Sequence, residues 1–169
     1  MNINIPGPMH VADLKWLESM ATKMNSIVEI GSWRGRSTHA LLTGCNGSVY
    51  AVDNWKGSAF KSIYLYHDAR KYDIHSEFLK NVGHFKNLYV VKMDSMDALS
   101  YFANNSVDMI FIDAEHSYEY VKDDIGYWLP KAKKVICGHD IKLPSVAKAV
   151  KDVIGKCEYV GRNIWSKRI

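Results

Sequence analysis

Short apolar segments alternate with segments of helical periodicity along most of this chain, and this alternation constrains the fold more than any other feature. Strand character is found at residues 26–30, 48–52, 88–92, 107–112, 134–137, 158–160 and 164–167. Apolar spacing, or a helix-opening proline, indicates helices at residues 10–24, 36–44, 75–82, 96–102, 118–128 and from 144 onward. Repeated strand–helix units imply a mostly parallel sheet covered by helices. We therefore expect an α/β fold of the Rossmann-like, doubly wound type, with a mostly parallel seven-stranded sheet and helices on both faces.

The length and composition fit one such domain. The 169 residues are 47% apolar and 24% charged, near the globular average, which argues against disordered or fibrous architectures. We expect a single domain over residues 1–169, with an N-terminal helical extension at 1–25 and a lid or acceptor loop at 55–75. The three cysteines are widely spaced, and no apolar run approaches the roughly 20 residues of a membrane span. These features predict a cytoplasmic protein without a membrane partner.

Charged residues are spread over the chain rather than gathered into a run. The 22 basic and 18 acidic side chains give a net charge of +4. A mild excess without a basic cluster is weak support for a nucleic-acid partner, and none is expected.

Glycine and acidic residues recur where the predicted strands end. Gly31, Asp53, Asp94, Asp113 and Asp140 each lie at or directly after a strand segment. In doubly wound sheets, ligands bind beyond the carboxyl ends of the strands, near the point where the strand order reverses. These five residues are therefore expected to converge on one edge of the sheet and to form a functional site.

The first strand leads into a turn with glycines at Gly31 and Gly35, which allow the backbone to approach a ligand closely. Trp33 occupies the position where dinucleotide-binding proteins have their second glycine, so a diphosphate ligand is disfavoured. About 20 residues later, Asp53 can accept hydrogen bonds from the hydroxyls of a ribose. Asp94, after the third strand, is placed to meet an adenine amino group. Each acid taken alone could equally be a solvated turn residue or a helix cap.

The chain resembles the class I S-adenosylmethionine-dependent methyltransferases, in particular small-molecule O-methyltransferases and cephalosporin-hydroxylase-like proteins. The resemblance covers nearly the whole chain from residue 26 and rests on VEIGSWRGRST, AVDNW, FLKNVGHFKNLYVVKMDSMDAL, VDMIFIDAEHSYEYVKDDIGYWLPKAKKVICGHD and NIWSKRI. It implies S-adenosylmethionine as cofactor. The implied cofactor-binding residues are Glu29, Gly31, Ser32, Trp33, Gly35, Ser37, Asp53, Asn54, Trp55, Asp94, Ser95 and Asp113. In this family the acid and glycines of the first motif surround the amino acid part of the cofactor, and the acid matching Asp53 holds the ribose.

Two acids and two histidines follow the fourth and fifth strands. Methyl transfer is a direct displacement, so the protein mainly aligns an acceptor and removes its proton. A histidine titrates near neutrality and suits that role. His116 is the first candidate base and His139 the second, with Asp113 as their catalytic partner. Alternatively, Asp113 orients the amino group of the cofactor and His116 caps the following helix.

Asp113 and Asp140 are also candidate ligands for a hard divalent cation such as Mg²⁺. Metal-dependent relatives use acids at these two positions and commonly a third polar ligand directly after the second acid. This chain has Ile141 there, so its metal dependence stays open.

The leading hypothesis is O-methylation of a small-molecule or sugar-like hydroxyl. The acceptor site is expected to be open, or completed by the second subunit of a homodimer, and Trp33, Tyr64 and Tyr66 are candidates to stack on a flat acceptor. The alternatives are a nucleic-acid or protein methyltransferase and a module that binds the cofactor without turnover. A nicotinamide-dependent dehydrogenase is disfavoured by Trp33.

Overall fold

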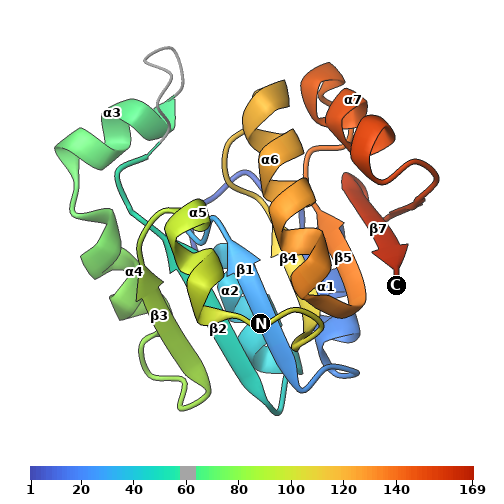
Figure 1. Cartoon of the computed structure of the whole chain (residues 1–169). Helices are drawn as coiled ribbons and strands as arrows, with labels where there is room; N and C mark the ends of the chain where they lie inside the picture. The colour runs from blue at the N-terminus through green and yellow to red at the C-terminus, as the bar shows by residue number, and fades with distance from the viewer. Residues whose placement is uncertain (58–63) are drawn as a thin grey trace.

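The computed structural model describes residues 1–57 and 64–169 and contains a seven-stranded sheet in the order β3-β2-β1-β4-β5-β7-β6 (Figure 1). The strands are β1 (Ser26–Ile30), β2 (Ser48–Asp53), β3 (Leu88–Lys92), β4 (Val107–Ile112), β5 (Ala132–Gly138), β6 (Glu158–Val160) and β7 (Ile164–Arg168). β1 to β5 pair in parallel, whereas β7 runs antiparallel to both β5 and β6. The predicted mostly parallel, seven-stranded, doubly wound sheet is confirmed.

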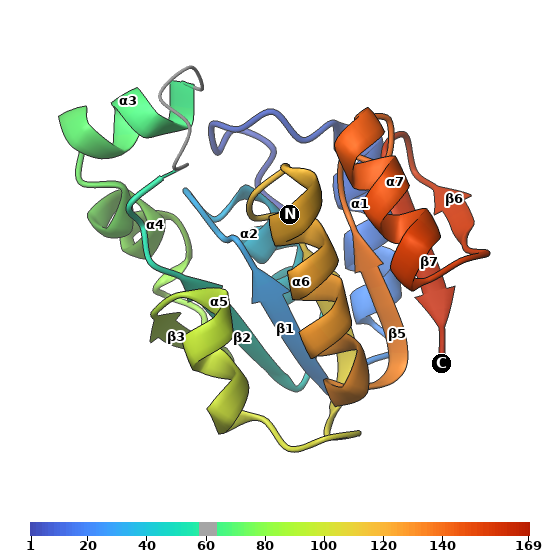
Figure 2. The same cartoon turned by 45° about the horizontal axis from the view of Figure 1, so that its top comes forward.

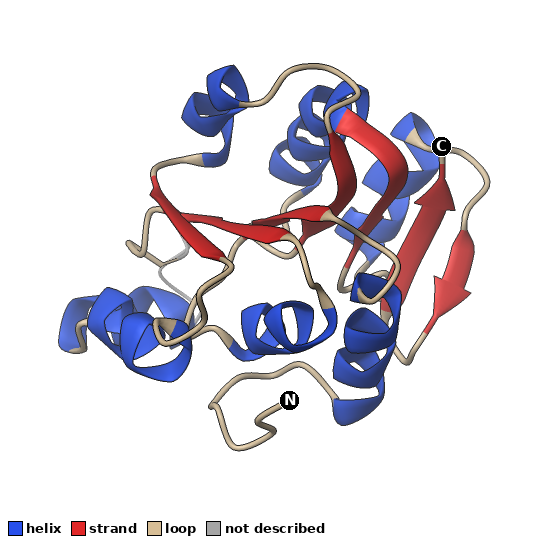
Figure 3. Cartoon of the chain, turned by 90° about the horizontal axis from the view of Figure 1, so that it is seen from below, coloured by secondary structure: helices blue, strands red, loops and turns tan. Residues whose placement is uncertain are grey.

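Helices cover both faces of this sheet (Figure 3). The helices are α1 (Val11–Ala21), α2 (Arg36–Gly44), α3 (Tyr64–Lys71), α4 (Ile74–Val82), α5 (Ser95–Ala98), α6 (Tyr118–Trp128) and α7 (Pro144–Val153). In Figure 1, α5, α6 and α7 lie in front of the sheet, and α1 and α2 lie behind it. The short 3₁₀ turns η1 (Leu99–Tyr101) and η2 (Leu129–Lys131) follow α5 and α6.

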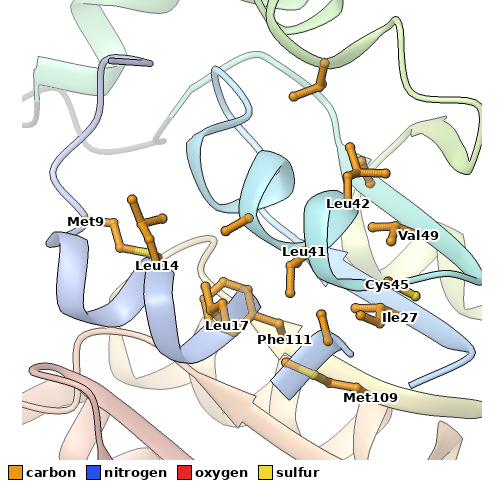
Figure 4. Close-up of a cluster of buried hydrophobic side chains, with 14 of the residues drawn as sticks. Met9, Leu14, Leu17, Ile27, Leu41, Leu42, Cys45, Val49, Met109 and Phe111 are labelled. Atoms are coloured by element: carbon orange, nitrogen blue, oxygen red, sulfur yellow. The ribbon is translucent and has the colours of Figure 1, made fainter. Parts of the chain in front are cut away.

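Two apolar clusters, one on each face, hold the layers together. Successive residues of a strand point to opposite faces. Ile27 therefore packs on the α1–α2 side with Leu14 and Leu17, which are fully buried (Figure 4), while Val28 packs on the α6–α7 side with Ile125. Full burial of a leucine stabilises the fold by about 1.5–3 kcal/mol, and Leu17→Ala is expected to cost about 2–5 kcal/mol.

Helix α1, which belongs to the segment expected as an N-terminal extension, packs against α2 and forms part of the core. Its N-cap is His10, whose Nδ1 accepts a hydrogen bond from the backbone N–H of Ala12. No helix within residues 1–57 and 64–169 is long and apolar enough to span a membrane.

The segment expected to be a lid loop at residues 55–75 differs in part from that expectation. Residues 58–63 lie outside the described residues, but Tyr64–Lys71 form helix α3. The segment has no regular apolar stripe; in α3 the guanidinium of Arg70 lies 3.4 Å from the ring centre of Tyr66, one turn away. Such neighbours one turn apart support a helix whose apolar pattern is weak.

Candidate active site

The candidate site lies where the strand order reverses, between β1 and β4. Here Asp113 N–H donates to Ile30 O and Gly31 N–H donates to Val52 O, which holds three strand ends together. Gly31 has φ +88°, and a Cβ at this position would lie 2.4 Å from Asp113 O. Only glycine fits this close contact, because both the left-handed backbone and the missing space exclude a side chain.

Two adjoining cavities open at this edge. The larger, of about 430 Å³, runs from the ends of β1, β2 and β4 to the start of α5 and to α6. The smaller, of about 80 Å³, lies between the turn after β1, the end of β5 and the N-terminal segment. They share Gly31, Trp33, Asp113, Ala114 and His116. The two cavities therefore meet at the ends of β1 and β4.

Glu29 is fully buried near the end of β1, on the side that faces α2. Its Oε2 accepts hydrogen bonds from Ser32 Oγ at 2.7 Å and from Thr38 Oγ1 at 2.5 Å, while its Oε1 has no hydrogen-bond partner among the described residues. Burial raises the pKa of Glu29 to about 7, although the nearby hydroxyl groups of Ser37, Thr38 and Ser32 oppose the rise. A buried carboxyl of this kind is costly to ionise without a ligand.

Asp53, at the end of β2, binds the turn after β1. Its Oδ2 accepts from the backbone N–H groups of Ser32 at 2.9 Å and Trp33 at 2.8 Å, and its Oδ1 accepts from Trp55 N–H at 2.6 Å. Burial raises the pKa of Asp53, and these three N–H groups oppose the rise. Two accepted bonds fill the capacity of Oδ2, which leaves Oδ1 one site for a ribose hydroxyl. Most of the hydrogen-bonding capacity of Asp53 is therefore used to hold the turn after β1 in place.

Trp33 and Trp55 adopt left-handed backbone conformations, with φ of 47° and 56°. The indole N–H of Trp55 donates to Trp33 O, and the Trp55 ring packs against His75 and Phe78. Non-glycine residues in this conformation carry strain that the surrounding structure must offset, and such residues cluster at functional sites. Trp33 lines both cavities, whereas Trp55 is buried beneath the larger one.

The far end of the larger cavity is polar and acidic. Asn54 Nδ2 donates to Asp94 Oδ1 at 2.5 Å, and Ser95 Oγ donates to Asp124 Oδ1 at 2.5 Å. Burial raises the pKa of Asp124 to about 6, against the hydrogen bond from Ser95. Residues of α6 that the sequence analysis had not assigned also line this end: Tyr120, Asp123 and Asp124. The sequence did contain a signal for Asp124: this acid lies on the apolar face of the predicted helix, between Val121 and Trp128.

The opposite end holds the predicted catalytic residues. His116 Nε2 lies 2.8 Å from Asp140 Oδ2 and 3.9 Å from Asp113 Oδ1. Burial by itself lowers the pKa of His116, but the nearby carboxylates of Asp113 and Asp140 outweigh it and raise the pKa to about 10. This raised pKa favours the imidazolium form of His116 at neutral pH, which must lose its proton before it can act as a base.

His139 is packed between three carboxylates. Its Nδ1 lies 3.3 Å from Asp140 Oδ1 and 3.6 Å from Asp113 Oδ1, and its Nε2 lies 3.4 Å from Asp13 Oδ2. Burial lowers the pKa of His139, but the hydrogen bond to Asp140 and the charges of Asp113 and Asp140 raise it to about 9. Asp13, on α1, was not predicted as a site residue.

The structure brings most of the predicted site residues to one place. Gly31, Trp33, Asp53, Asn54, Asp94, Ser95, Asp113 and His116 line the larger cavity, and Ser32, Ser37 and Asp140 line the smaller one. Glu29, Gly35 and Trp55 are buried beneath these surfaces. His139 is also buried, at 8% exposure, and reaches the site through Asp113 and Asp140. Tyr66 belongs to α3, and the side chain of Tyr64 lies outside the described set.

Three groups that can bind a divalent cation lie together at the ends of β4 and β5. Ile141, in the position where metal-dependent relatives commonly have a polar ligand, is 7% exposed and packs in the apolar cluster under α6 and α7. His139 lies beside these acids, and one N or O atom each from Asp113, His139 and Asp140 lie within 4.8 Å of one another. Two carboxylates and one imidazole are an ordinary ligand set for a divalent metal.

Comparison with known proteins agrees with this arrangement. Curated protein y4gI of Sinorhizobium fredii, itself uncharacterized, is 26% identical over 137 residues, which cover 73% of this chain and 14% of that protein. This chain thus spans only a small part of the length of the curated relative.

Solved structures share the fold. The O-methyltransferase NovP superposes with a TM-score of 0.68 at 14% identity, covering 95% of this chain and 80% of its own. An O-methyltransferase from Bacillus cereus, solved in complex with S-adenosylhomocysteine, has a TM-score of 0.63 at 16% identity and covers 96% and 84%. At these identities, the likeness establishes the fold.

A family model described as a methyltransferase domain matches residues 28–141. This range runs from β1 to the residue after Asp140 and thus includes both ends of the candidate site. The chain belongs to the methyltransferase domain family.

Proposed function

We propose that this chain is an S-adenosylmethionine-dependent methyltransferase that transfers a methyl group to a hydroxyl of a small molecule. One observation carries the proposal: the larger cavity joins an acidic end at Asp94 and Asp124 to the His116–Asp140 pair at the strand reversal. Its volume of about 430 Å³ lies in the range of small-molecule and cofactor pockets. Membership in the methyltransferase domain family and the cofactor-bound relatives of the same fold support it.

In this proposal, the cofactor lies along the larger cavity with its adenosine near Asp53 and Asp94. Asp53 Oδ1 is available to one ribose hydroxyl, and the Asn54–Asp94 and Ser95–Asp124 pairs offer polar partners to the adenine edge. The amino acid part then lies over the turn after β1, next to Asp113. Because the sulfonium and ammonium groups of the cofactor are cationic, an acidic cavity favours their binding.

His116 is proposed as the general base, because it lies where the two cavities meet. An acceptor hydroxyl in the smaller cavity would lie between the methyl donor and the imidazole. Asp113 and Asp140 hold the ring of His116, and His139 is the alternative base. A divalent cation held by Asp113 and Asp140 would lower the pKa of a bound hydroxyl.

The N-terminal segment is proposed to limit the size of the acceptor. Residues Pro6–Met9 line the smaller cavity and run across the carboxyl ends of the strands (Figure 2). Arg36 fixes this segment by donating to the carbonyls of Ile3, Ile5 and Met9. A cavity of about 80 Å³ walled by prolines accommodates a small group rather than a polymer. A cytoplasmic location and a homodimer also remain proposals.

Calorimetric titration with S-adenosylmethionine and S-adenosylhomocysteine, with NAD as comparison and EDTA present, tests the proposal. Binding of both adenosyl ligands, but not of NAD, is expected. Methyl transfer from radiolabelled cofactor to a panel of small hydroxyl compounds then tests turnover. Failure to bind either adenosyl ligand would reject the cofactor assignment. Tight binding without transfer to any acceptor would favour a module that binds the cofactor without catalysis.

A further inference from the structure

Strand β3 lies at one edge of the sheet, and no strand within residues 1–57 and 64–169 pairs with its outer side (Figure 1). It is five residues long, pairs with β2 without a shift in register and contains no proline. The opposite edge strand, β6, has only three residues. Proteins usually protect an edge by shortness, bulges, prolines or charges, because its free N–H and C=O groups can pair with another strand. Apart from Lys92 at its end, β3 lacks these protections.

The backbone of β3 directs the groups of every second residue outward. In β2, the N–H of Val49 donates to Asn87 O, just before β3, and the parallel ladder continues through every second residue from there. The N–H and C=O groups of Val90 and Lys92 therefore point away from β2. These groups are placed to bond a strand that adds to the edge.

Apolar side chains flank this edge on both faces of the sheet. Tyr89, which is 50% exposed, stacks on Tyr50 of β2 with ring centres 5.0 Å apart. Val90, which is 38% exposed, points to the opposite face because successive strand residues alternate. The edge thus offers apolar surface as well as hydrogen-bonding groups to a second extended strand.

We propose that β3 pairs antiparallel with β3 of a second copy of this chain, with Val90 opposite the partner's Val90, so that the two sheets become one. In this register, residues with outward backbone groups face each other, since Leu88 then lies opposite the partner's Lys92. Such directly opposed residues exchange both of their backbone hydrogen bonds. A two-fold axis at Val90 makes the contact self-complementary and closes the assembly as a dimer.

Charge favours this register over its neighbours. It brings the exposed Lys86, before β3, next to the partner's Asp94, after β3, once at each end of the paired strands. The next possible register in one direction sets Lys86 against the partner's Lys92, and that in the other direction moves Leu88 beyond the end of the partner strand. Opposite charges across a strand pair stabilise it, and like charges destabilise it. This complementarity of the edge with itself favours a second copy over an unrelated extended peptide.

The size of the contact limits its strength. Two strands of five residues bury less surface than a standard protein interface of about 1,600 Å². The dimer is therefore expected to be weak and to form only as the concentration rises. The pairing uses the outer edge of β3 and not the cavities, so it does not depend on the proposed function.

Sedimentation velocity of the full chain over a series of concentrations tests the proposal, and wild type is expected to change from monomer to dimer. Val90→Lys sets like charges opposite each other at the axis and should raise the dissociation constant at least about 10-fold. Val90→Pro should do so too, because it removes an outward N–H that β2 does not use. Val90→Thr is the matched control: it keeps this N–H and a branched side chain, and it should dimerise like wild type.

A charge variant tests the register. Lys86→Glu sets two acids against each other at each end of the paired strands and should raise the dissociation constant about 3- to 10-fold at low salt, with a smaller effect at high salt. Lys23→Glu makes the same change in charge at an exposed residue after α1 and should leave the dissociation constant unchanged.

Amide hydrogen exchange, followed by NMR, locates the contact. The N–H groups of Tyr89 and Val91 are bonded to β2 and should be protected at every concentration. Those of Val90 and Lys92 should become protected only as the dimer forms. Circular dichroism verifies that each variant folds, and if Val90→Pro does not fold, Val90→Lys carries the test.

Three results would overturn the proposal. A wild type that stays monomeric at the highest concentration would leave the edge of β3 to another extended segment. A dimer whose dissociation constant is unchanged in Val90→Lys would place the interface elsewhere on the molecule. Open-ended assemblies in place of a dimer would mean that the edge does not pair about a two-fold axis.

Discussion

The two halves of the site hold their acids in opposite ways. Around β1 and β2, Glu29 and Asp53 are held by hydroxyl and backbone N–H groups, and burial raises the pKa of both. Around β4 and β5, Asp140 is paired with two histidines, and although burial alone would raise its pKa, the neighbouring imidazoles of His116 and His139 hold the pKa below the usual range.

The difference indicates what each half can do. Neutral donors leave Glu29 and Asp53 without a cationic partner, so a cationic ligand bound there would favour their charged forms. Paired imidazoles and carboxylates can exchange protons or take up a cation, which suits chemistry. In the proposed function, the first half would hold the cofactor and the second would carry out the reaction.

Gly31→Ala should have the largest effect, because Gly31 is the residue through which the turn after β1 packs against Asp113 at the end of β4. The new Cβ would lie 2.4 Å from Asp113 O, at φ +88°. Strain of about 1–2 kcal/mol from the left-handed backbone adds to about 1–3 kcal/mol from overpacking, and cofactor binding should be lost. Gly155→Ala is the control, since Gly155 has φ +70° but nothing within 4 Å. Urea unfolding and calorimetry compare the two; equal losses would show that the contact is unimportant.

His116→Gln should affect the reacting half alone. We expect kcat to fall about 10²- to 10⁴-fold because the proposed base is lost, with little change in cofactor affinity. Single-turnover methyl transfer on an identified acceptor measures the first quantity and calorimetry the second. His84→Ala, which changes an exposed histidine after α4, should leave both unchanged. Retention of full turnover by His116→Gln would move the role of base to His139.

Asp53→Asn should affect the cofactor half alone. An amide cannot accept at both positions, so at least one of the N–H groups of Ser32, Trp33 and Trp55 would face a donor. Stranding buried donors is expected to cost about 2–4 kcal/mol of unfolding free energy and to weaken cofactor binding. The control Asp73→Asn changes the exposed N-cap of α4, where asparagine caps equally well. Urea unfolding of both variants measures the loss; a similar, small loss in both would contradict the role given to Asp53.

The sequence was informative where the chemistry is local. Strand ends and helix starts are encoded within a few residues, so β1, β3, β4 and β6 begin and end where the pattern predicts. The same pattern places Asp53 and Asp113 at one edge of the sheet. It could not reveal that Asp13 faces His139, because these residues are 126 positions apart and meet only after α1 packs beside β5.

The sequence analysis did not predict helix α3, nor that Asp123 and Asp124 of α6 line the larger cavity. In both cases the local apolar pattern does not show the long-range contact. The helix of Tyr64–Lys71 is short and polar on average, and one of its contacts is the long-range ion pair of Asp68 with Arg34, at 3.0 Å. Asp124 is buried on a helix face that otherwise packs into the core. A carboxylate on an apolar face, as at Asp13 and Asp124, is the signal that sequence analysis could use.

Glu29→Gln should have the smallest effect, and in the opposite direction. The pKa of Glu29 rises from 4.5 to about 7 on folding, so the folded state binds the proton more tightly than the unfolded state. The unfolding free energy therefore falls as the pH rises from 4.5 to about 7 and stays low above that. Glutamine cannot ionise, so the variant should lack this fall and be about 1–3 kcal/mol more stable than wild type at pH 8, with near-equal stability at acidic pH.

Urea unfolding at both pH values measures the difference, and Glu158→Gln, at an exposed acid of β6, is the control. A variant that is less stable than wild type at pH 8 would mean that the charged hydrogen bonds from Ser32 and Thr38 outweigh the cost of burial. In that case the cofactor half would be stabilised by its own charge, and the contrast with the histidine-paired half would disappear. If the variant is more stable but binds the cofactor more weakly, Glu29 lowers the stability of the free protein and strengthens cofactor binding.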